Sequence, residues 1–209
     1  MFPRTLLQHA HDTLALLGKQ PFLKNAYLAG GSSLALQLGH RRSEDFDFFS
    51  DQEFSTLEIK AELKKICKYT KDNETPKTMV GKFNNVKFSL FYYPYKLIDR
   101  TTKYVGVNLA SPKEIAAMKL VAITDRGTKK DYIDLHFLAN KKFSLEKMLE
   151  FYDQKYHILE SNRLTLFKAL QFFEDANNSD MPEMLEKVDW EDVKEFFRKE
   201  VVHLANKYI

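Results

Sequence analysis

Acidic and aromatic residues alternate along Asp45-Phe46-Asp47-Phe48-Phe49, and this pattern constrains the fold more than any other in the chain. Because successive side chains of a β-strand point to opposite faces, a strand here places Asp45 and Asp47 together and sends Phe46 and Phe48 into a core. Two neighbouring carboxylates repel each other unless a cation lies between them, and their oxygen atoms suit Mg²⁺ or Mn²⁺. The alternative is a solvated Asp-x-Asp at the end of a strand.

A glycine-rich turn precedes these carboxylates. Residues 27–29 read as a short buried strand and residues 33–38 as a helix, which leaves Gly30-Gly31-Ser32 at the junction. Backbone amides at a helix N-terminus bind anions, and glycine keeps them accessible. The alternative is a tight turn in which Ser32 or Ser33 caps the helix. An anion-binding turn and a metal-binding carboxylate pair within about twenty residues favour transfer of a nucleotidyl group.

The remaining periodicity predicts an α+β fold. Strands are expected at residues 27–29, 45–49, 78–83, 86–92 and 104–108, with a hairpin that turns at Asn84-Asn85. Helices are expected at residues 5–17, 33–38, 56–69, from 112 onward, 145–156, 161–173 and 191–207. We therefore expect a small mixed sheet flanked by helices over residues 1–110 and a helical lobe over residues 111–209, with the active site in the cleft between them.

The predicted helix from residue 112 begins with a capping box, Ser111-Pro112-Lys113-Glu114. Lys119 is the only charge in the following run Ala116-Ala117-Met118-Lys119-Leu120-Val121-Ala122-Ile123. A cation in such an apolar helix either extends its ammonium to solvent or is matched to an anion, whereas most lysines are simply solvated. Asp131 and Asp134 lie three residues apart and share a helix face, where an ordinary surface salt bridge from Lys130 to Asp134 is the alternative to a functional role.

The chain resembles a known family in four blocks of sequence. The blocks are Leu28-Ala29-Gly30-Gly31-Ser32-Ser33 through Asp45-Phe46-Asp47-Phe48-Phe49, Phe91-Tyr92-Tyr93-Pro94-Tyr95, Ala110-Ser111-Pro112-Lys113-Glu114 through Lys119-Leu120, and Arg126-Gly127-Thr128-Lys129-Lys130-Asp131-Tyr132-Ile133-Asp134-Leu135. They resemble the AbiEii/AbiGii toxin nucleotidyltransferases, a branch of the DNA polymerase beta-like nucleotidyltransferase superfamily. The resemblance covers a little over half of the chain, and the first block is the specific one.

The resemblance implies a nucleotidyltransferase fold and a metal-dependent toxin of a toxin–antitoxin or phage-defence system. Such a toxin would transfer nucleotides from a nucleoside triphosphate to an acceptor such as the 3′ end of tRNA, and a cognate antitoxin would be its protein partner. The implied nucleotide-binding residues are Gly30, Gly31, Ser32, Ser33, Arg41 and Lys119. The implied catalytic residues are Asp45, Asp47, Lys119 and Asp134, with Mg²⁺ or Mn²⁺ on Asp45 and Asp47 and with Asp131 and His40 as accessory residues.

The roles of some residues in this resemblance remain open. His40 and Arg41 would position the triphosphate or would instead bond the acidic loop at Glu44 or Asp45. The superfamily usually carries a third carboxylate on a later strand, and Ser89 occupies that place here. We therefore hypothesise that Asp134 or Asp131, rather than an acid on the strand, deprotonates the acceptor hydroxyl.

Charge is distributed unevenly along the chain. Residues 55–142 hold 18 Lys and Arg against 9 Asp and Glu, whereas residues 143–209 hold 9 against 14. The basic middle favours a polyanionic partner such as RNA, and lysines at positions 60, 64, 65, 68 and 71 would form a helical stripe for it or a plain solvated face. The acidic C-terminal part is a candidate surface for the antitoxin.

Composition points to a protein of the cytoplasm. The apolar stretches fall short of the roughly eighteen residues that span a bilayer, so that no membrane partner is expected. One cysteine, Cys67, excludes an internal disulfide and fits a reducing compartment.

Two other functions remain open. A small-molecule nucleotidyltransferase of the antibiotic-modifying kind would share the metal pair but would need an acidic pocket for a cationic substrate, and the basic middle argues against it. A catalytically silent binding protein is the second alternative, and the serine at position 89 is its best support.

Overall fold

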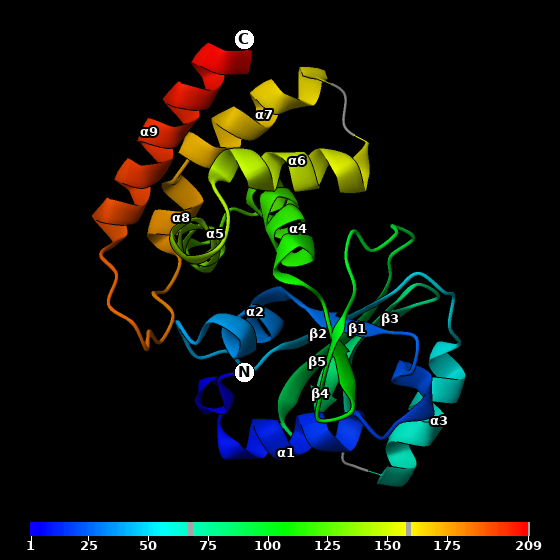
Figure 1. Cartoon of the computed structure of the whole chain (residues 1–209). Coiled ribbons are helices and arrows are strands. Elements are labelled where there is room, and N and C mark those ends of the chain that lie inside the picture. Colours follow the sequence, from blue (N-terminus) through cyan, green and yellow to red (C-terminus); the bar gives the residue numbers. More distant parts are fainter. Residues whose placement is uncertain (67–68, 158–159, 209) are drawn as a thin grey trace. The chain divides into compact units, whose positions relative to one another are not determined.

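The structure is a computed structural model that describes residues 1–66, 69–157 and 160–208. Contacts divide the chain into two compact units, Met1–Ser111 (unit 1) and Pro112–Ile209 (unit 2). Unit 1 contains a sheet with helices, and the elements of unit 2 are helical (Figure 1). The fold is therefore of the α+β class that the sequence predicted.

Unit 1 is built on a mixed sheet with the strand order β3-β4-β5-β2-β1-β7-β6 in the described part of the chain. Its strands are β1 (Tyr27–Ala29), β2 (Phe46–Ser50), β3 (Tyr69–Thr75), β4 (Thr78–Phe83), β5 (Val86–Tyr92), β6 (Thr102–Tyr104) and β7 (Val107–Leu109). Its helices are η1 (Pro3–Thr5), α1 (Gln8–Leu17), η2 (Pro21–Leu23), α2 (Gly30–Leu38) and α3 (Thr56–Ile66). Strand β2 is parallel to β5 and antiparallel to β1, and β1 is parallel to β7.

The core of unit 1 lies between α1, α3 and one face of the sheet. Phe46 and Phe48 of β2 are fully buried there, together with Leu14 of α1 and Leu63 of α3. Burial of each such side chain contributes about 1.5–3 kcal/mol. The expected alternation of β2 is thus confirmed, because Phe46 and Phe48 enter the core while Asp47 between them faces the opposite side.

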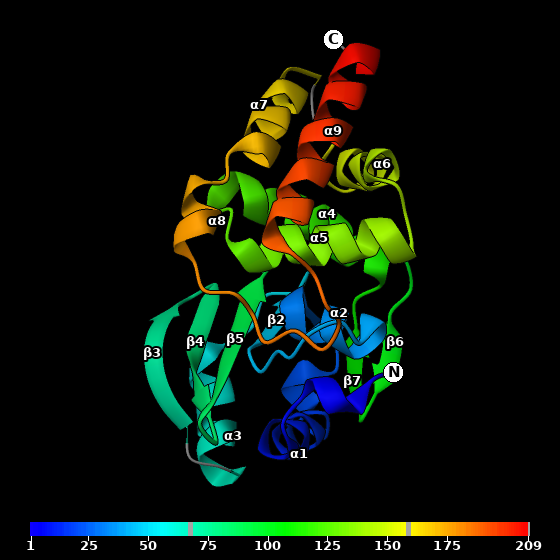
Figure 2. The same ribbon diagram turned by 90° about the vertical axis from the view of Figure 1, so that its left-hand side faces the viewer.

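Unit 2 consists of α4 (Pro112–Asp125), α5 (Lys129–Lys141), α6 (Leu145–Tyr156), α7 (Glu160–Gln171), α8 (Glu174–Asn178) and α9 (Trp190–Tyr208). Helix α4 packs against α5, α6 and α7, and α9 packs against α5 and α7, as Figure 2 shows. A buried ion pair joins Glu114 in the first turn of α4 to Lys155 near the end of α6. Among the described residues, no helix is both long and apolar enough to cross a membrane.

Several predicted elements have the bounds that the sequence indicated. These are β1, β4, β5 and α6, at residues 27–29, 78–83, 86–92 and 145–156. The hairpin between β4 and β5 turns at Asn84 and Asn85, which both have positive φ (50° and 66°). Asparagine tolerates this left-handed backbone better than most residues, so the predicted turn is confirmed.

Other predictions were wrong in the strands. The single strand expected at residues 104–108 is a hairpin of β6 and β7 that turns at Val105 and Gly106, both with positive φ. Strand β3 was missed, and it places Lys71 on an edge strand rather than on the predicted helix. Helix α3 ends at Ile66, and Cys67 and Lys68 lie outside the described residues.

Helix bounds also differ. Helix α1 begins at Gln8 rather than residue 5, because the 3-10 turn η1 precedes it, and β2 begins at Phe46 rather than Asp45. Helix α8 (Glu174–Asn178) lies between the helices expected at residues 161–173 and 191–207, where no helix was expected. Helix α2 begins at Gly30, three residues before the predicted start, with Ala29 as its N-cap residue and no side-chain cap. Neither Ser32 nor Ser33 is therefore the helix cap.

Candidate functional site

The first turn of α2 begins directly at the end of β1 and contains both glycines. Gly30 has a φ of +64°, a left-handed conformation that favours glycine because it has no Cβ. A Cβ at this position would lie 3.1 Å from Oδ2 of Asp47, so that the Asp47 carboxylate stands immediately beside the helix start. Strand pairing explains the approach, since Ala29 of β1 is the partner of Asp47 in β2.

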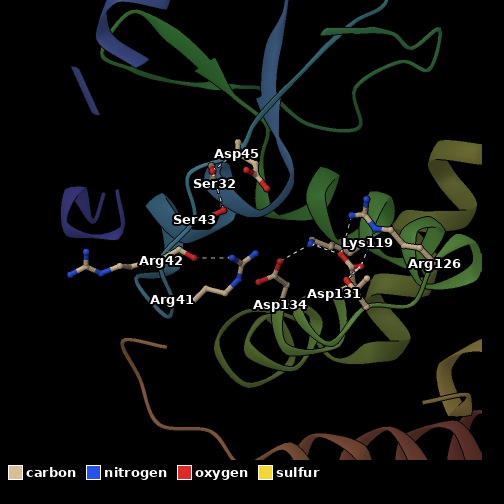
Figure 3. Close-up of polar contacts among 10 residues, drawn as sticks. Ser32, Arg41, Arg42, Ser43, Asp45, Lys119, Arg126, Asp131 and Asp134 are labelled. Atoms are coloured by element: carbon tan, nitrogen blue, oxygen red, sulfur yellow. Dashed lines mark hydrogen bonds and ion pairs between the residues drawn. The ribbon is translucent and has the colours of Figure 1, made fainter. Parts of the chain in front are cut away.

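Ser32 ties this helix to the loop that carries Asp45. Its hydroxyl donates to the backbone carbonyl oxygen of Asp45 at 2.6 Å and lies 3.0 Å from the Ser43 hydroxyl (Figure 3). Ser33 is equally buried, and its hydroxyl accepts from Gln37 at 3.2 Å. Both hydroxyls therefore contact the protein itself in this structure, and backbone N–H groups remain the natural anion donors of the turn.

The residues before the acidic loop are buried. His40 is 0% and Arg41 is 3% exposed, although both types of side chain are usually near the surface. Nη1 of Arg41 donates to the Arg42 carbonyl oxygen at 2.9 Å, and a Cβ at Gly31 would overlap Nη2 of Arg41. The guanidinium thus lies against the first turn of α2, where it adds positive charge beside the helix N-terminus.

Asp45 and Asp47 are placed differently. Asp47 is the second residue of β2, whereas Asp45 precedes the strand and lies 4.0 Å from Nζ of Lys87 in an exposed ion pair. Asp47 is paired in register with Ser89 of β5. The neighbouring strand therefore carries a serine hydroxyl directly beside Asp47. This is the position at which the resemblance to the superfamily led us to expect a third carboxylate.

The donor set fits Mg²⁺ or Mn²⁺. Asp45 and Asp47 supply hard oxygen atoms, and the glycine turn leaves room next to Asp47 that a larger residue would fill. Mg²⁺ is usually held by one or two carboxylates together with substrate phosphates and waters, not by a complete protein cage. Consistent with this, the described residues contain no cluster of three or more His, Cys, Asp and Glu side chains that would bind a metal by themselves.

In unit 2, Lys119 is matched to two anions. Its Nζ lies 2.8 Å from Oδ1 of Asp131 and 2.6 Å from Oδ2 of Asp134, and its side chain is only 5% exposed (Figure 3). Both carboxylates are completely buried on one face of α5. The alternative of a surface salt bridge between Lys130 and Asp134 is therefore wrong in its main point, since the cluster is internal and its cation is Lys119.

Asp131 has further donors. Arg126 contacts both carboxylate oxygens at 3.2 and 3.3 Å, and the Thr128 hydroxyl donates to Oδ2 at 2.6 Å. Burial alone would raise the pKa of Asp131, but the charges and hydrogen bonds of Lys119 and Arg126 outweigh it and hold this pKa below its usual value of 3.8. Asp131 is therefore an ionised structural anion rather than a group that takes up protons.

The structure thus gathers the candidate residues into two sets. Gly30, Gly31, Ser32, Ser33, His40, Arg41, Asp45 and Asp47 lie in unit 1, and Lys119, Asp131 and Asp134 lie in unit 2. That Lys119 and Asp134 share one cleft with the carboxylates of unit 1 stays a prediction.

Sequence reasoning missed Ser43, Arg126 and Thr128 as supporting residues. Only Thr128 had a local signal, because it directly precedes α5 and lies three residues before Asp131.

Comparisons with known proteins show the family and the fold of this chain. Residues 13–203 match the model of the family described as "Nucleotidyl transferase AbiEii toxin, Type IV TA system". An uncharacterized protein of Aquifex aeolicus (strain VF5) is 33% identical over 205 residues, which cover 95% of this chain and 97% of that protein.

Two solved structures share the fold. JHP933 from Helicobacter pylori is 17% identical, with a TM-score of 0.55, and the match covers 97% of this chain and 94% of that one. MenT4, a nucleotidyltransferase toxin from Mycobacterium tuberculosis, is 14% identical, with a TM-score of 0.51 and coverage of 93% and 81%. Because the family match extends over most of the sequence, the chain belongs to the AbiEii nucleotidyl transferase toxin family of type IV toxin–antitoxin systems.

Proposed function

We propose that this nucleotidyltransferase moves a nucleotidyl group from a nucleoside triphosphate to the 3′ end of an RNA, with tRNA as the acceptor. One observation carries the proposal: the first turn of α2 stands beside the Asp47 carboxylate, with Gly30 in contact range of Oδ2. The backbone amides that would bind phosphate and a carboxylate that would bind the metal ion therefore lie next to each other within unit 1. The basic segment between residues 55 and 142 supports a polyanionic acceptor.

In this proposal unit 1 binds the triphosphate. The N–H groups of Gly30 and Gly31 face its phosphates at the helix N-terminus, and Arg41 adds positive charge beside them. Ser32 acts through its hydrogen bond to the Asp45 carbonyl, which fixes the acidic loop against the helix.

Asp45 and Asp47 would hold the divalent ion that nucleotidyltransferases of this family generally use. When bound, such an ion neutralises charge on the triphosphate and orients its phosphates for displacement.

Unit 2 would contribute Lys119 to the phosphates and an acid to the acceptor hydroxyl. Asp131 is a poor proton acceptor because Lys119, Arg126 and Thr128 already donate to its oxygens and its pKa is lowered. Asp134 is the better candidate for the function that a carboxylate at position 89 would otherwise have.

Replacement of each aspartate by Asn tests this assignment in single-turnover transfer. We expect the chemical step to slow on the order of a hundredfold in Asp134→Asn, with a smaller loss in Asp131→Asn that follows reduced stability. Unchanged rates in both variants would exclude a base from unit 2.

The substrate class is tested by incubating the protein with labelled nucleoside triphosphates, Mg²⁺ and total RNA, with Asp47→Asn as the inactive control. Labelled tRNA supports the proposal. A labelled small molecule would favour the antibiotic-modifying alternative, and the absence of any labelled product would favour a silent binding protein.

The same proposal includes a cognate antitoxin and action in the cytoplasm, where tRNA is charged. The acidic segment 143–209 is the proposed docking surface. Capture of the antitoxin by protein that lacks this segment would exclude that surface.

A further inference from the structure

A second row of side chains crosses the sheet of unit 1 parallel to the row that contains Asp47. Strand register places these residues side by side on one face: Phe91 of β5, Phe49 of β2, Tyr27 of β1, Asn108 of β7 and Lys103 of β6. Phe49 follows Asp47 by two residues, so the row lies on the face of the carboxylate and about 7 Å from it. From β5 to β6 it extends about 19 Å across four strand spacings.

The half of the row nearest β5 is aromatic. The Phe49 ring lies 5.9 Å from Tyr27, 5.4 Å from Phe91 and 5.2 Å from Tyr93, measured between ring centroids. Tyr93 continues the segment beyond β5, where its N–H donates to the Ser50 carbonyl, and its ring contacts Tyr95 at 4.8 Å. Tyr95 is 40% exposed, so that the aromatic cluster ends in a ring that solvent reaches.

The other half of the row leads into a basic pocket of about 510 Å³. Lys19, Lys24 and Lys103 line it, and its lining contains no acidic residue among those the structure describes. Asn108 fixes one wall, because its side chain donates to the carbonyl oxygens of Lys24 and Ala26 at 3.2 Å each.

Close packing of two glycines fixes the opposite wall of this pocket. A Cβ at Gly18 would overlap the carbonyl oxygen of Val105, and Gly106 has a φ of +89°. The β6–β7 turn is therefore held against the end of α1, and the lysines project from a constrained backbone.

We propose that this aromatic–lysine row binds the single-stranded segment of the RNA acceptor that precedes the reacting 3′ end. Aromatic rings that stack bases, followed by cations that follow the phosphates, form the standard surface for unpaired nucleic acid. The row begins on β5, the strand of Ser89, beside which the acceptor hydroxyl is expected, and it crosses β1 at Tyr27, three residues before the helix start that would receive the triphosphate. The inference rests on the proposed function in that it takes RNA as the acceptor.

The lysines of α3 provide a matched control. Ile59 and Leu63 pack this helix on the core face of the sheet, so Lys64 and Lys65 lie on the side opposite Asp47. They belong to the lysine stripe that the sequence predicted, and the row proposal assigns them no contact with the acceptor.

The test measures fluorescence anisotropy of a labelled single-stranded RNA of about ten nucleotides with the full chain, without triphosphate or metal. We expect Tyr95→Ala to weaken binding about tenfold and Tyr95→Phe to retain it, because stacking needs the ring but not the hydroxyl. The double variant Lys24→Ala/Lys103→Ala should reduce the slope of log affinity against log salt by about 1.4, since each phosphate contact contributes about 0.7. The Lys64→Ala/Lys65→Ala variant should bind as the parent does.

An RNA with an abasic site at the stacked position provides a second measurement. It should bind the parent protein more weakly, with no additional loss in Tyr95→Ala. Equal RNA binding by the parent, Tyr95→Ala and the Lys24/Lys103 variant would overturn the row, and so would losses confined to the α3 variant. Weaker binding of a labelled triphosphate to Tyr95→Ala, with RNA binding unchanged, would reassign the aromatic cluster to the nucleotide and overturn the proposal.

These outcomes separate the row from the reaction. RNA binding that follows the row, without transfer to any RNA, would leave the row intact and refute the proposed function alone. Normal transfer to RNA with unaltered binding in the row variants would refute the row alone.

Discussion

The two groups of carboxylates in this chain differ in how their charge is balanced. The Asp45 side chain in unit 1 is 44% exposed, and its cation, Lys87, is an exposed side chain whose Nζ lies 4.0 Å away. Asp131 and Asp134 in unit 2 are completely buried and share Lys119, with Arg126 at the edge. Unit 2 thus neutralises its acids within the protein, whereas in unit 1 the charge of Asp45 is balanced at the surface, where an added ion can reach it. The difference teaches that substitutions of the acids in unit 1 should affect transfer with little effect on stability, whereas substitutions in the buried cluster of unit 2 should also reduce the stability of the fold.

The largest effect is expected for Asp47→Asn. Loss of one charged ligand should reduce transfer on the order of a thousandfold, because metal ions contribute several kcal/mol of transition-state stabilisation. The free energy of unfolding should change little, since the side chain is not part of the core. The matched control is Asp51→Asn, an exposed residue just after β2. A large drop in stability with near-normal transfer would reverse the comparison.

Lys119→Met should be the most destabilising change in unit 2. It leaves two buried carboxylates without their shared cation, and removal of one partner of a buried pair costs about 3–5 kcal/mol. Urea denaturation measures this loss, with exposed Lys142→Met as a control near zero. If both variants unfold at the same urea concentration, the buried cluster does not stabilise unit 2.

Ser89→Asp tests whether the acids of unit 1 bind a metal ion. A third acid beside Asp47 adds negative charge to the group in unit 1, so Mn²⁺ affinity should rise roughly tenfold. Electron paramagnetic resonance of free Mn²⁺ provides the measurement. Thr78→Asp places an acid on the same face at β4, opposite Phe91, and should have a smaller effect. Equal affinities in Ser89→Asp and the parent would show that Asp47 and residue 89 do not face one ion.

The smallest effect concerns pH. The pKa of Asp131 is lower in the folded chain than its usual 3.8, so this group stabilises the fold above that pH and its contribution is lost as pH falls through the folded value. Between about pH 5 and pH 2, the free energy of unfolding should therefore decline less steeply in Asp131→Asn than in the parent. Parallel pH profiles of the two proteins would contradict the lowered pKa.

Local patterns predicted much of unit 1. The bounds of β1, β4 and β5 follow from runs of apolar residues, and the turn at Asn84-Asn85 follows from residue type. Both signals depend only on a few neighbouring residues, so they can be recognised without knowledge of the tertiary fold. Strand β3 was not predicted because Tyr69–Thr75 is polar and lies at the sheet edge. It is defined by its pairing with β4 rather than by an alternation of apolar and polar residues. The turn between β6 and β7 was not predicted because Val105 lies in it with positive φ, which a β-branched residue rarely adopts.

The candidate site was predictable in composition but not in contacts. The family resemblance singled out Ser89 as the place of a third acid, and the structure pairs it with Asp47. The partners of Lys119, by contrast, are 12 and 15 positions away on another helix. The bond from the Ser32 hydroxyl to the Asp45 carbonyl oxygen was not predicted, because it is set by tertiary packing. Helix propensity also gave a late start for α2, because two glycines disfavour a helix that the end of β1 nevertheless imposes.

The alternation in β2 has a consequence for how relatives of this chain can diverge. Phe46 and Phe48 point to the core face of the strand and Asp47 points to the other face. An insertion or deletion of one residue within Phe46–Ser50 would therefore turn the aspartate into the core and a phenylalanine out of it. Length variation should therefore accumulate in the irregular segment between Leu38 and Asp45 and be purged from the strand. Relatives of this chain can thus lengthen the loop before these acids far more readily than they can change the register of the strand that follows.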